Sequence, residues 1–206
     1  MDDTFSSASV PSFSTPDFTA VLLAGGKSTR MGQDKAGLLI GDVPLWQRQL
    51  ATLQASGASE ILISGCRDGP YAKSDFRIVE DIDPDLGPLG GLVAAFKSAK
   101  HELVAVLAID LPRMNAAFLR SLLSKAPVVP RRENRFEPLA AFYSKRTLAV
   151  FQRRLHEREL SMQRAIRELA ERHEITLYDV SGPEALLFEN LNTPEDLAHF
   201  VENRDN

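Results

Sequence analysis

The segment from 18 to 36 constrains this chain more than any other part of the sequence. It begins with a mostly apolar run that ends in Gly25 and Gly26. Such a run predicts a buried strand followed by a tight turn, in which backbone N–H groups can approach a ligand closely. Three cations follow in the same loop: Lys27, Arg30 and Lys35. No acid lies between Asp17 and Asp34, so the loop is locally cationic in a chain of formal net charge −4, and we predict that it binds a polyphosphate.

Two common phosphate-binding motifs do not fit this loop. The Gly-Gly-Lys-Ser sequence at positions 25 to 28 resembles the end of a P-loop, but that motif requires a glycine where this chain has Val21. The dinucleotide-binding fingerprint requires a glycine where this chain has Lys27. The loop therefore belongs to a third class of phosphate-binding turn.

The composition predicts one globular domain in a reducing compartment. The chain has 206 residues, of which 44% are hydrophobic and 25% charged, which is enough for one substantial core. Cys66 is the only cysteine, and the four histidines show no metal-ligand spacing. The first 26 residues lack lysine and arginine, and no apolar run approaches the ~20 residues that span a bilayer. We expect a cytoplasmic protein without a membrane segment, in which 1–16 form a flexible tail and 17–206 a single domain.

Strand-like and helix-like segments alternate after the loop. This alternation predicts an α/β fold of the doubly wound, Rossmann-like type, with a mostly parallel sheet and helices on both faces. Besides the strand before Gly25, we predict strands at Ile61–Ser64, Arg77–Asp81 and Leu103–Asp110, helices between Pro44 and Gly57 and at Leu89–Ala99, and a strand-like segment at Leu139–Tyr143.

Polar or glycine residues stand where each of the first four strands is expected to end. They are Gly25, Ser64, Asp81 and Asp110. In doubly wound folds ligands bind beyond the carboxyl ends of the strands, so one crevice could collect all four. Asp110 ends a continuously apolar strand, where an ionised carboxylate is costly unless it is paired, solvated or bound to a cation. A Mg²⁺ ion that also binds substrate phosphates would meet that need, although a turn cap before Leu111 is an equally plain explanation.

The segment after Asp81 contains the turn Gly87-Pro88-Leu89-Gly90-Gly91. A carboxylate followed by a glycine-rich entry into a helix permits close contact with a base or a ribose. The alternative is a strand cap followed by an ordinary helix start. The two interpretations stay open on these residues alone.

The second half of the chain holds two further polar clusters. Arginines at 131, 132 and 135 suit a phosphorylated acceptor, and they are also common on solvated loops. The segment 146–173, dense in Arg and Glu, predicts amphipathic helices with a solvated charged face. Thr193 can cap a helix that begins with Pro194. Asn190 and Asn192 alternate on a predicted strand and are expected to face one side together.

Four motifs carry a resemblance to a known family. The sequence Leu-Ala-Gly-Gly-Lys-Ser-x-Arg-Met-Gly-x-Asp-Lys at 23–35 resembles the signature of nucleotidyltransferases that make nucleotide-sugars and related cofactors. With GDVPLWQR at 41–48, it is most similar to that of the molybdenum cofactor guanylyltransferases. Glu80-Asp81 with 87–91, Arg135 with 137–139, and Asn-x-Asn-Thr-Pro-Glu at 190–195 match the same family in the same order. The resemblance spans about Thr19 to Phe200.

The resemblance implies a reaction in which the terminal phosphate of molybdopterin attacks the α-phosphorus of GTP and pyrophosphate leaves. It implies catalytic roles for Lys35, Arg30 and Asp110, with Asp110 also holding Mg²⁺. The implied nucleotide-binding residues are Leu23, Ala24, Gly25, Gly26, Lys35, Ser64, Asp81, Gly87, Pro88, Gly91 and Asp110. The implied acceptor-binding residues are Arg135, Asn190 and Asn192. Gly25 and Gly26 would offer backbone donors to the phosphates.

Some assignments stay open at this point. Ser64 stands where some relatives carry asparagine, so a related transferase that uses CTP, or GTP with another phosphorylated acceptor, is an alternative. A nucleotide-binding module without catalysis is a second alternative. We expect a monomer that binds no nucleic acid and that hands its product to cofactor-insertion proteins or to acceptor molybdoenzymes.

Overall fold

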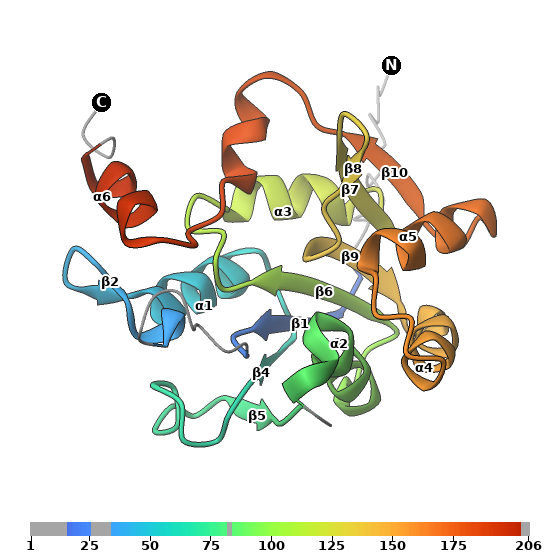
Figure 1. Cartoon of the computed structure of the whole chain (residues 1–206), viewed down its shortest axis with the longest axis horizontal. Coiled ribbons are helices and arrows are strands. Elements are labelled where there is room, and N and C mark those ends of the chain that lie inside the picture. The colour runs from blue at the N-terminus through green and yellow to red at the C-terminus, as the bar shows by residue number, and fades with distance from the viewer. Residues whose placement is uncertain (1–15, 26–33, 82–83, 203–206) are drawn as a thin grey trace, which may run out of the picture.

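A mixed, mostly parallel sheet forms the centre of the molecule (Figure 1). The computed structural model describes residues 16–25, 34–81 and 84–202. Parallel pairing joins β6 (Leu103–Ala108), β1 (Phe18–Leu23), β4 (Glu60–Ser64) and β5 (Arg77–Val79) in that order across the sheet. On the other side of β6, β9 (Ala140–Ser144) pairs antiparallel with both β6 and β7 (Val128–Arg132). β10 (Thr176–Asp179) is parallel to β7, and β8 (Arg135–Phe136) forms a hairpin with β7.

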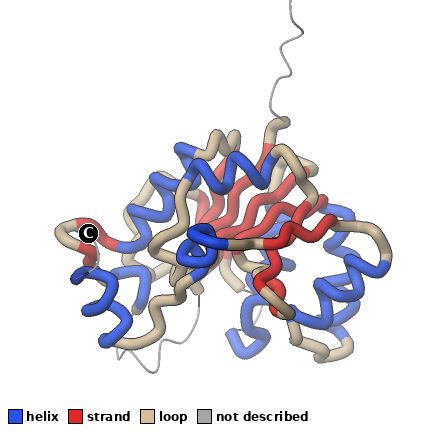
Figure 2. The backbone as a smooth tube through the Cα atoms, turned by 90° about the horizontal axis from the view of Figure 1, so that it is seen from above, coloured by secondary structure: helices blue, strands red, loops and turns tan. Residues whose placement is uncertain are grey.

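Helices cover both faces of this sheet, as Figure 2 shows. α1 (Leu45–Ala55), α3 (Ala116–Leu123) and α6 (Pro194–Glu202) contribute to one core, and α2 (Gly87–Ser98), α4 (Leu148–His156) and α5 (Met162–Glu171) contribute to the other. Short 3-10 helices at Lys35–Gly37, Pro84–Leu86, Lys145–Thr147 and Gly182–Phe188 and a small hairpin of β2 (Leu39–Ile40) and β3 (Val43–Pro44) complete the described elements. No described helix has the length and apolar content needed to cross a membrane.

The apolar run of β1 supplies both cores. Ala20 and Leu22 pack into the core under α1 and α3, whereas Val21 and Leu23 pack into the core under α2, α4 and α5. Successive strand residues point to opposite faces, so a strand covered on both sides is apolar at nearly every position; in β1 the exception is the buried Thr19. This pattern is the physical reason for the predicted doubly wound fold, which is confirmed.

Several predicted boundaries differ from the observed ones. β6 ends at Ala108 and not at Asp110: the Ile109 N–H still donates to the Leu23 carbonyl, but residues 109 and 110 already form a turn. β5 ends at Val79, two residues before Asp81, and α2 begins at Gly87 rather than Leu89. Pro44 belongs to β3, so α1 begins one residue after it. The antiparallel β9 makes the sheet mixed.

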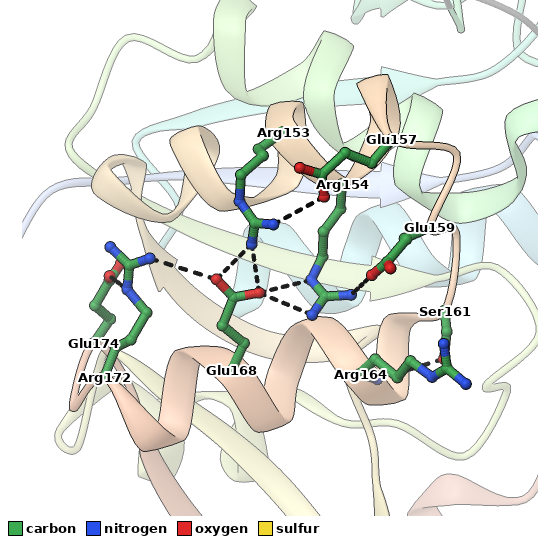
Figure 3. A network of polar contacts seen from close by, with 9 residues as sticks. All are labelled: Arg153, Arg154, Glu157, Glu159, Ser161, Arg164, Glu168, Arg172 and Glu174. Carbon is green, nitrogen blue, oxygen red and sulfur yellow. Dashed lines mark hydrogen bonds and ion pairs between the residues drawn. The ribbon is translucent and has the colours of Figure 1, made fainter.

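A network of charged side chains joins α4 to α5 (Figure 3). The Glu168 carboxylate accepts hydrogen bonds from Arg153, at 2.5 and 2.6 Å, and from the Arg154 Nε at 2.9 Å. The Arg154 side chain is 9% exposed and that of Glu168 20% exposed. The prediction that this charge run is only a solvated face is therefore wrong for these two residues. Burial acts to raise the pKa of Glu168, but the hydrogen bonds from Arg153 and Arg154 outweigh it and the pKa lies below its ordinary value.

Glu168→Gln is expected to lower the free energy of unfolding at pH 7 by about 1 to 2 kcal/mol, because three arginines, Arg153, Arg154 and Arg172, lose a shared carboxylate partner. A carboxylate whose pKa is depressed on folding stabilises the protein above its unfolded pKa, and this contribution is lost as pH falls through the folded pKa. The difference between wild type and variant should therefore shrink on acidification below about pH 4.5. Urea unfolding at several pH values measures it. Glu157→Gln, which removes a more exposed partner of Arg153, is the control and should cost less than about 0.5 kcal/mol.

Candidate active site

A cavity at the carboxyl edge of the sheet collects residues that follow four neighbouring strands. The strand order along that edge is β6, β1, β4 and β5, so the residues after these strands lie next to one another. Three strand spacings separate β6 from β5, about 14 Å. The cavity is lined by every described residue that the sequence predicted to bind nucleotide: Leu23, Ala24, Gly25, Lys35, Ser64, Asp81, Gly87, Pro88, Gly91 and Asp110. They share one cavity as predicted, and their binding of a nucleotide stays a prediction.

Asp81 sits in a narrow space between two glycines. The Ser64 hydroxyl donates a 2.9 Å hydrogen bond to Asp81 Oδ1. A Cβ atom on Gly91 would lie 2.6 Å from Ser64 Oγ and 2.7 Å from Asp81 Oδ1, and one on Gly25 would lie 3.2 Å from Asp81 Oδ2. A side chain at Gly91 would therefore force Ser64 or Asp81 to move, whereas one at Gly25 would only press on Asp81. Burial raises the pKa of Asp81, and the hydrogen bond from Ser64 offsets part of that rise.

The backbone of Gly25 bonds to the end of β4. The N–H groups of Ala24 and Gly25 both donate to the Ser64 carbonyl, at 2.8 and 3.0 Å. The Gly25 N–H is therefore engaged within the protein in this structure, and its donation to a phosphate stays a prediction. These two hydrogen bonds extend the pairing of β1 with β4 and hold the turn against the cavity. Gly26 and Arg30, which were predicted to contact the phosphates, lie outside the described residues.

Lys35, Asn192 and Asp110 meet at the β6 end of the cavity. The Lys35 Nζ donates to Asn192 Oδ1 at 2.7 Å and lies 3.6 Å from Asp110 Oδ2. Lys35 and Asn192 are separated by 157 positions in the chain. The partner that holds Lys35 at 2.7 Å is an uncharged amide, so the ammonium keeps most of its positive charge available to an anion in the cavity. The side chains of Lys35 and Asp110 are each about one-fifth exposed, which limits screening by solvent.

The C-terminal segment that carries Asn192 is fixed on both sides. On one side, the Leu191 N–H donates to the Asp110 carbonyl at 2.9 Å. On the other, Thr193 and Asp196 form a capping box: the Asp196 N–H donates to Thr193 Oγ1, and the N–H groups of Asn192 and Thr193 donate to Asp196 Oδ2. The hydrogen bond from Asn192 is the main reason that the pKa of Asp196 lies below its ordinary value. The predicted Thr193 cap is confirmed.

The predicted strand through Asn190 and Asn192 is wrong. Residues 189–192 have no strand pairing, because their backbone bonds to the Asp110 loop and to the start of α6 instead. Only Asn192 reaches Lys35. Asn190 lines a separate cavity with Arg113, Glu189 and Phe200.

Arg135 lies away from the cavity that contains Lys35. It is exposed on β8, opposite Arg132 of β7, and β9 separates β7 from β6. Two other arginines of the cluster are already paired, Arg131 with Asp179 and Arg132 with Glu137. Among the described residues that line the cavity, none comes from this arginine cluster. The predicted contact of Arg135 with an acceptor stays a prediction.

The sequence interpretation missed several lining residues. Asp34, Ala108, Ile109 and Leu139 complete the wall. Asp34 accepts a hydrogen bond from the Ala36 N–H at 2.9 Å and so shapes the 3-10 turn that carries Lys35. The Asp34-Lys35 pair was the available signal for this role. Leu139 had no signal of its own, because its place depends on how β9 enters the sheet.

Three carboxylates line the cavity: Asp34 accepts from the Ala36 N–H, Asp81 accepts from the Ser64 hydroxyl, and Asp110 lies beside Lys35, where a divalent cation could accompany a phosphate. Among the described residues, no group of three or more His, Cys, Asp or Glu side chains could hold a metal ion. A Mg²⁺ ion usually takes one or two carboxylates and completes its coordination with waters and phosphate oxygens. The donor set therefore fits Mg²⁺ that arrives with a phosphate ligand, and it does not fit a structural metal held by protein alone.

The fold is similar to that of proteins with solved structures. The structure is similar to the crystal structure of molybdopterin-guanine dinucleotide biosynthesis protein A from Archaeoglobus fulgidus, with a TM-score of 0.71 and 22% identity, covering 89% of this chain and 97% of that one. The two proteins thus share one fold.

Sequence comparison identifies the family. Residues 20–175 match the MobA-like NTP transferase domain. A protein of Opitutus terrae named probable molybdenum cofactor guanylyltransferase is 37% identical over 85% of this chain and 90% of its own length. The molybdenum cofactor guanylyltransferase of Xanthomonas euvesicatoria is 34% identical over 91% of this chain and 97% of its own. The chain belongs to the MobA-like NTP transferase family.

Proposed function

We propose that this protein transfers GMP from GTP to the terminal phosphate of molybdopterin, releasing pyrophosphate and forming molybdopterin guanine dinucleotide. The observation that carries the proposal is the contact of Lys35 with Asn192 beside Asp110, in the cavity that the glycine turn also lines. The relatives named guanylyltransferases, which align over most of the chain, support the choice of substrates.

The cluster of Lys35, Asn192 and Asp110 suits the phosphates of the nucleotide. In the proposed reaction an oxygen of the acceptor phosphate bonds to the α-phosphorus, and the bond from that phosphorus to the bridging oxygen of pyrophosphate breaks. Lys35 would hold the triphosphate and neutralise charge that moves onto the leaving group. Asn192 would orient the Lys35 ammonium, and Asp110 would hold a Mg²⁺ ion. When bound, that ion supplies a Lewis acid for the phosphate oxygens.

The cavity end lined by Asp81 suits the nucleoside. Gly87, Pro88 and Gly91 present backbone and little side-chain bulk there, so a planar base could approach closely. The Ser64 hydroxyl already donates to Asp81, which leaves the carboxylate as an acceptor of further hydrogen bonds. Guanine carries two adjacent donor groups on its Watson–Crick edge, whereas cytosine carries one. A carboxylate that accepts from two neighbouring donors therefore favours GTP over CTP.

The remaining parts of the proposal concern the acceptor and the cell. Arg135, Asn190 and Asn192 are candidates for binding the acceptor, and of these only Asn192 contacts the Lys35 cluster. We further propose a cytoplasmic monomer, consistent with one exposed, unpaired cysteine. Its product would pass to cofactor-insertion proteins or to molybdoenzymes.

Pyrophosphate release tests the proposal. Purified protein with GTP, Mg²⁺ and molybdopterin is expected to release one pyrophosphate for each dinucleotide formed, and omission of the acceptor or of Mg²⁺ should abolish release. Replacement of GTP by CTP at equal concentration should lower the rate by at least about 10-fold, the effect of one missing hydrogen bond to a charged group. Equal rates with GTP and CTP would refute the guanylyl assignment. If no pyrophosphate is released with any nucleotide, the proposed transferase activity is refuted.

A further inference from the structure

Gln49 is a buried amide on an otherwise apolar helix face. It is 1% exposed and lies on α1 among Leu45, Leu50 and Leu53, which pack into the core. Burial of an amide costs free energy unless its polar atoms find partners, and leucine would suit this helix face better. A glutamine here therefore requires a reason beyond helix packing.

The amide contacts the chain on both sides of Asp110. The Gln49 Nε2 donates to the Leu111 carbonyl at 2.7 Å and makes a longer contact of 3.5 Å with the Ile109 carbonyl. Gln49 and Leu111 are 62 positions apart, so α1 is tied directly to the loop after β6. Only Asp110 lies between the two carbonyls that the amide contacts.

The other hydrogen bonds of this loop show that Gln49 is not needed simply to pair a buried carbonyl. The Leu111 carbonyl also accepts from the Met114 N–H at 3.1 Å. The loop is further held by Ile109 N–H on the Leu23 carbonyl and by Leu191 N–H on the Asp110 carbonyl. These backbone contacts fix the loop at its start and at Asp110 itself. Gln49 adds a side-chain anchor just after Asp110, where the chain turns away.

We propose that Gln49 is a positioning residue for Asp110. By holding the carbonyls that flank Asp110, it fixes the direction in which the Asp110 carboxylate enters the cavity, 3.6 Å from the Lys35 Nζ. The inference rests on the proposed function, because Asp110 there holds the ion that accompanies the triphosphate. Residues that orient a metal-binding side chain typically change metal affinity or activity by about 10- to 100-fold when replaced.

Gln49→Met is the variant that tests this role. Methionine keeps the length and the helix propensity of glutamine but cannot donate a hydrogen bond. We expect the melting temperature to stay within about 4 °C of wild type, since an apolar side chain suits the buried face. We expect kcat to fall by about 10-fold or more and the Mg²⁺ concentration for half-maximal activity to rise by a similar factor. The KM for GTP at saturating Mg²⁺ should change less than about 3-fold.

A second measurement does not depend on turnover. Isothermal titration of GTP with and without Mg²⁺ reports how much the ion strengthens nucleotide binding. In wild type we expect Mg²⁺ to strengthen GTP binding, and in Gln49→Met this strengthening should be about 10-fold smaller. GTP binding without Mg²⁺ should be equal in the two proteins. Gln54→Met, an exposed change on the same helix, is the matched control and should behave as wild type in every assay.

The outcomes separate the two proposals. If wild type is active and Gln49→Met has the same kcat and the same Mg²⁺ dependence, Gln49 has only a packing role and the inference is wrong, while the proposed function stands. The inference is also overturned if Gln49→Met loses activity only in proportion to the loss of folded protein and its Mg²⁺ dependence is unchanged. If wild type neither releases pyrophosphate nor binds GTP more tightly with Mg²⁺, the proposed function fails first, and the inference fails with it.

Discussion

Asp110→Asn is expected to reduce pyrophosphate release by at least about 100-fold without unfolding the protein. The change removes the anionic oxygen that faces the cavity 3.6 Å from Lys35, so a Mg²⁺ ion would lose the carboxylate that lies beside Lys35. An amide oxygen binds Mg²⁺ far more weakly than a carboxylate. The fold should survive, because the backbone hydrogen bonds of the loop do not involve the Asp110 side chain. Single-turnover pyrophosphate release measures the rate, and circular dichroism checks the fold.

The control for Asp110→Asn is Asp42→Asn. Asp42 is exposed in the turn between β2 and β3, and the substitution makes the same change in charge and volume. Its rate should equal that of wild type. If Asp110→Asn retains wild-type activity at low Mg²⁺, the assignment of the ion to Asp110 is wrong, and the turn-cap interpretation of this residue is the better one.

The fold could be predicted from the sequence because its main signals are local. A strand covered on both faces is apolar at nearly every position, so β1 and β6 are visible in the sequence without any knowledge of their partners. In a parallel sheet the ends of such strands meet at one edge, and this rule alone brought Gly25, Ser64 and Asp110 together. The antiparallel direction of β9 had no local signal, because it depends on the path of the chain between β7 and β9.

The parts of the site that escaped prediction depend on contacts between distant segments. In the sequence, Gln49 has no feature that distinguishes it from other helix residues, because its role depends on the packing of the loop after β6 against α1. Asn192 was expected on a strand, and its contact with Lys35 follows from a capping box that sets the chain direction before α6. The partly buried pair of Arg154 and Glu168 likewise looked solvated, since a charge pattern along one helix does not show which second helix covers it. The local sequence pattern thus predicts the helices and strands, whereas the packing of distant segments determines which polar residues face one another.

Lys35→Met is expected to lower kcat/KM for GTP by about 100- to 1,000-fold, the usual effect of removing one fixed charge from a phosphate site. Methionine keeps the length of the side chain and removes only the ammonium group, which now lies 2.7 Å from Asn192 Oδ1. Lys35→Arg restores the charge, but its wider guanidinium cannot occupy the same position between Asn192 and Asp110, so we expect only partial recovery. Lys97→Met, at an exposed position on α2, makes the same change in net charge and should leave kcat/KM unaltered.

The role of Asn192 can be separated from that of Lys35 by a double-mutant cycle. Asn192→Ala alone should lower kcat/KM by about 10-fold, because the Lys35 ammonium loses the acceptor that holds it and can turn toward the Asp110 carboxylate. If Asn192 acts through Lys35, the double variant Lys35→Met with Asn192→Ala should be no slower than Lys35→Met alone. Additive losses would instead show that Asn192 contacts the substrate independently, as a group that binds the acceptor phosphate. An amide at this position holds Lys35 without neutralising it, so Asn192→Asp should also be slow, because a second carboxylate would compete with the triphosphate for the same ammonium.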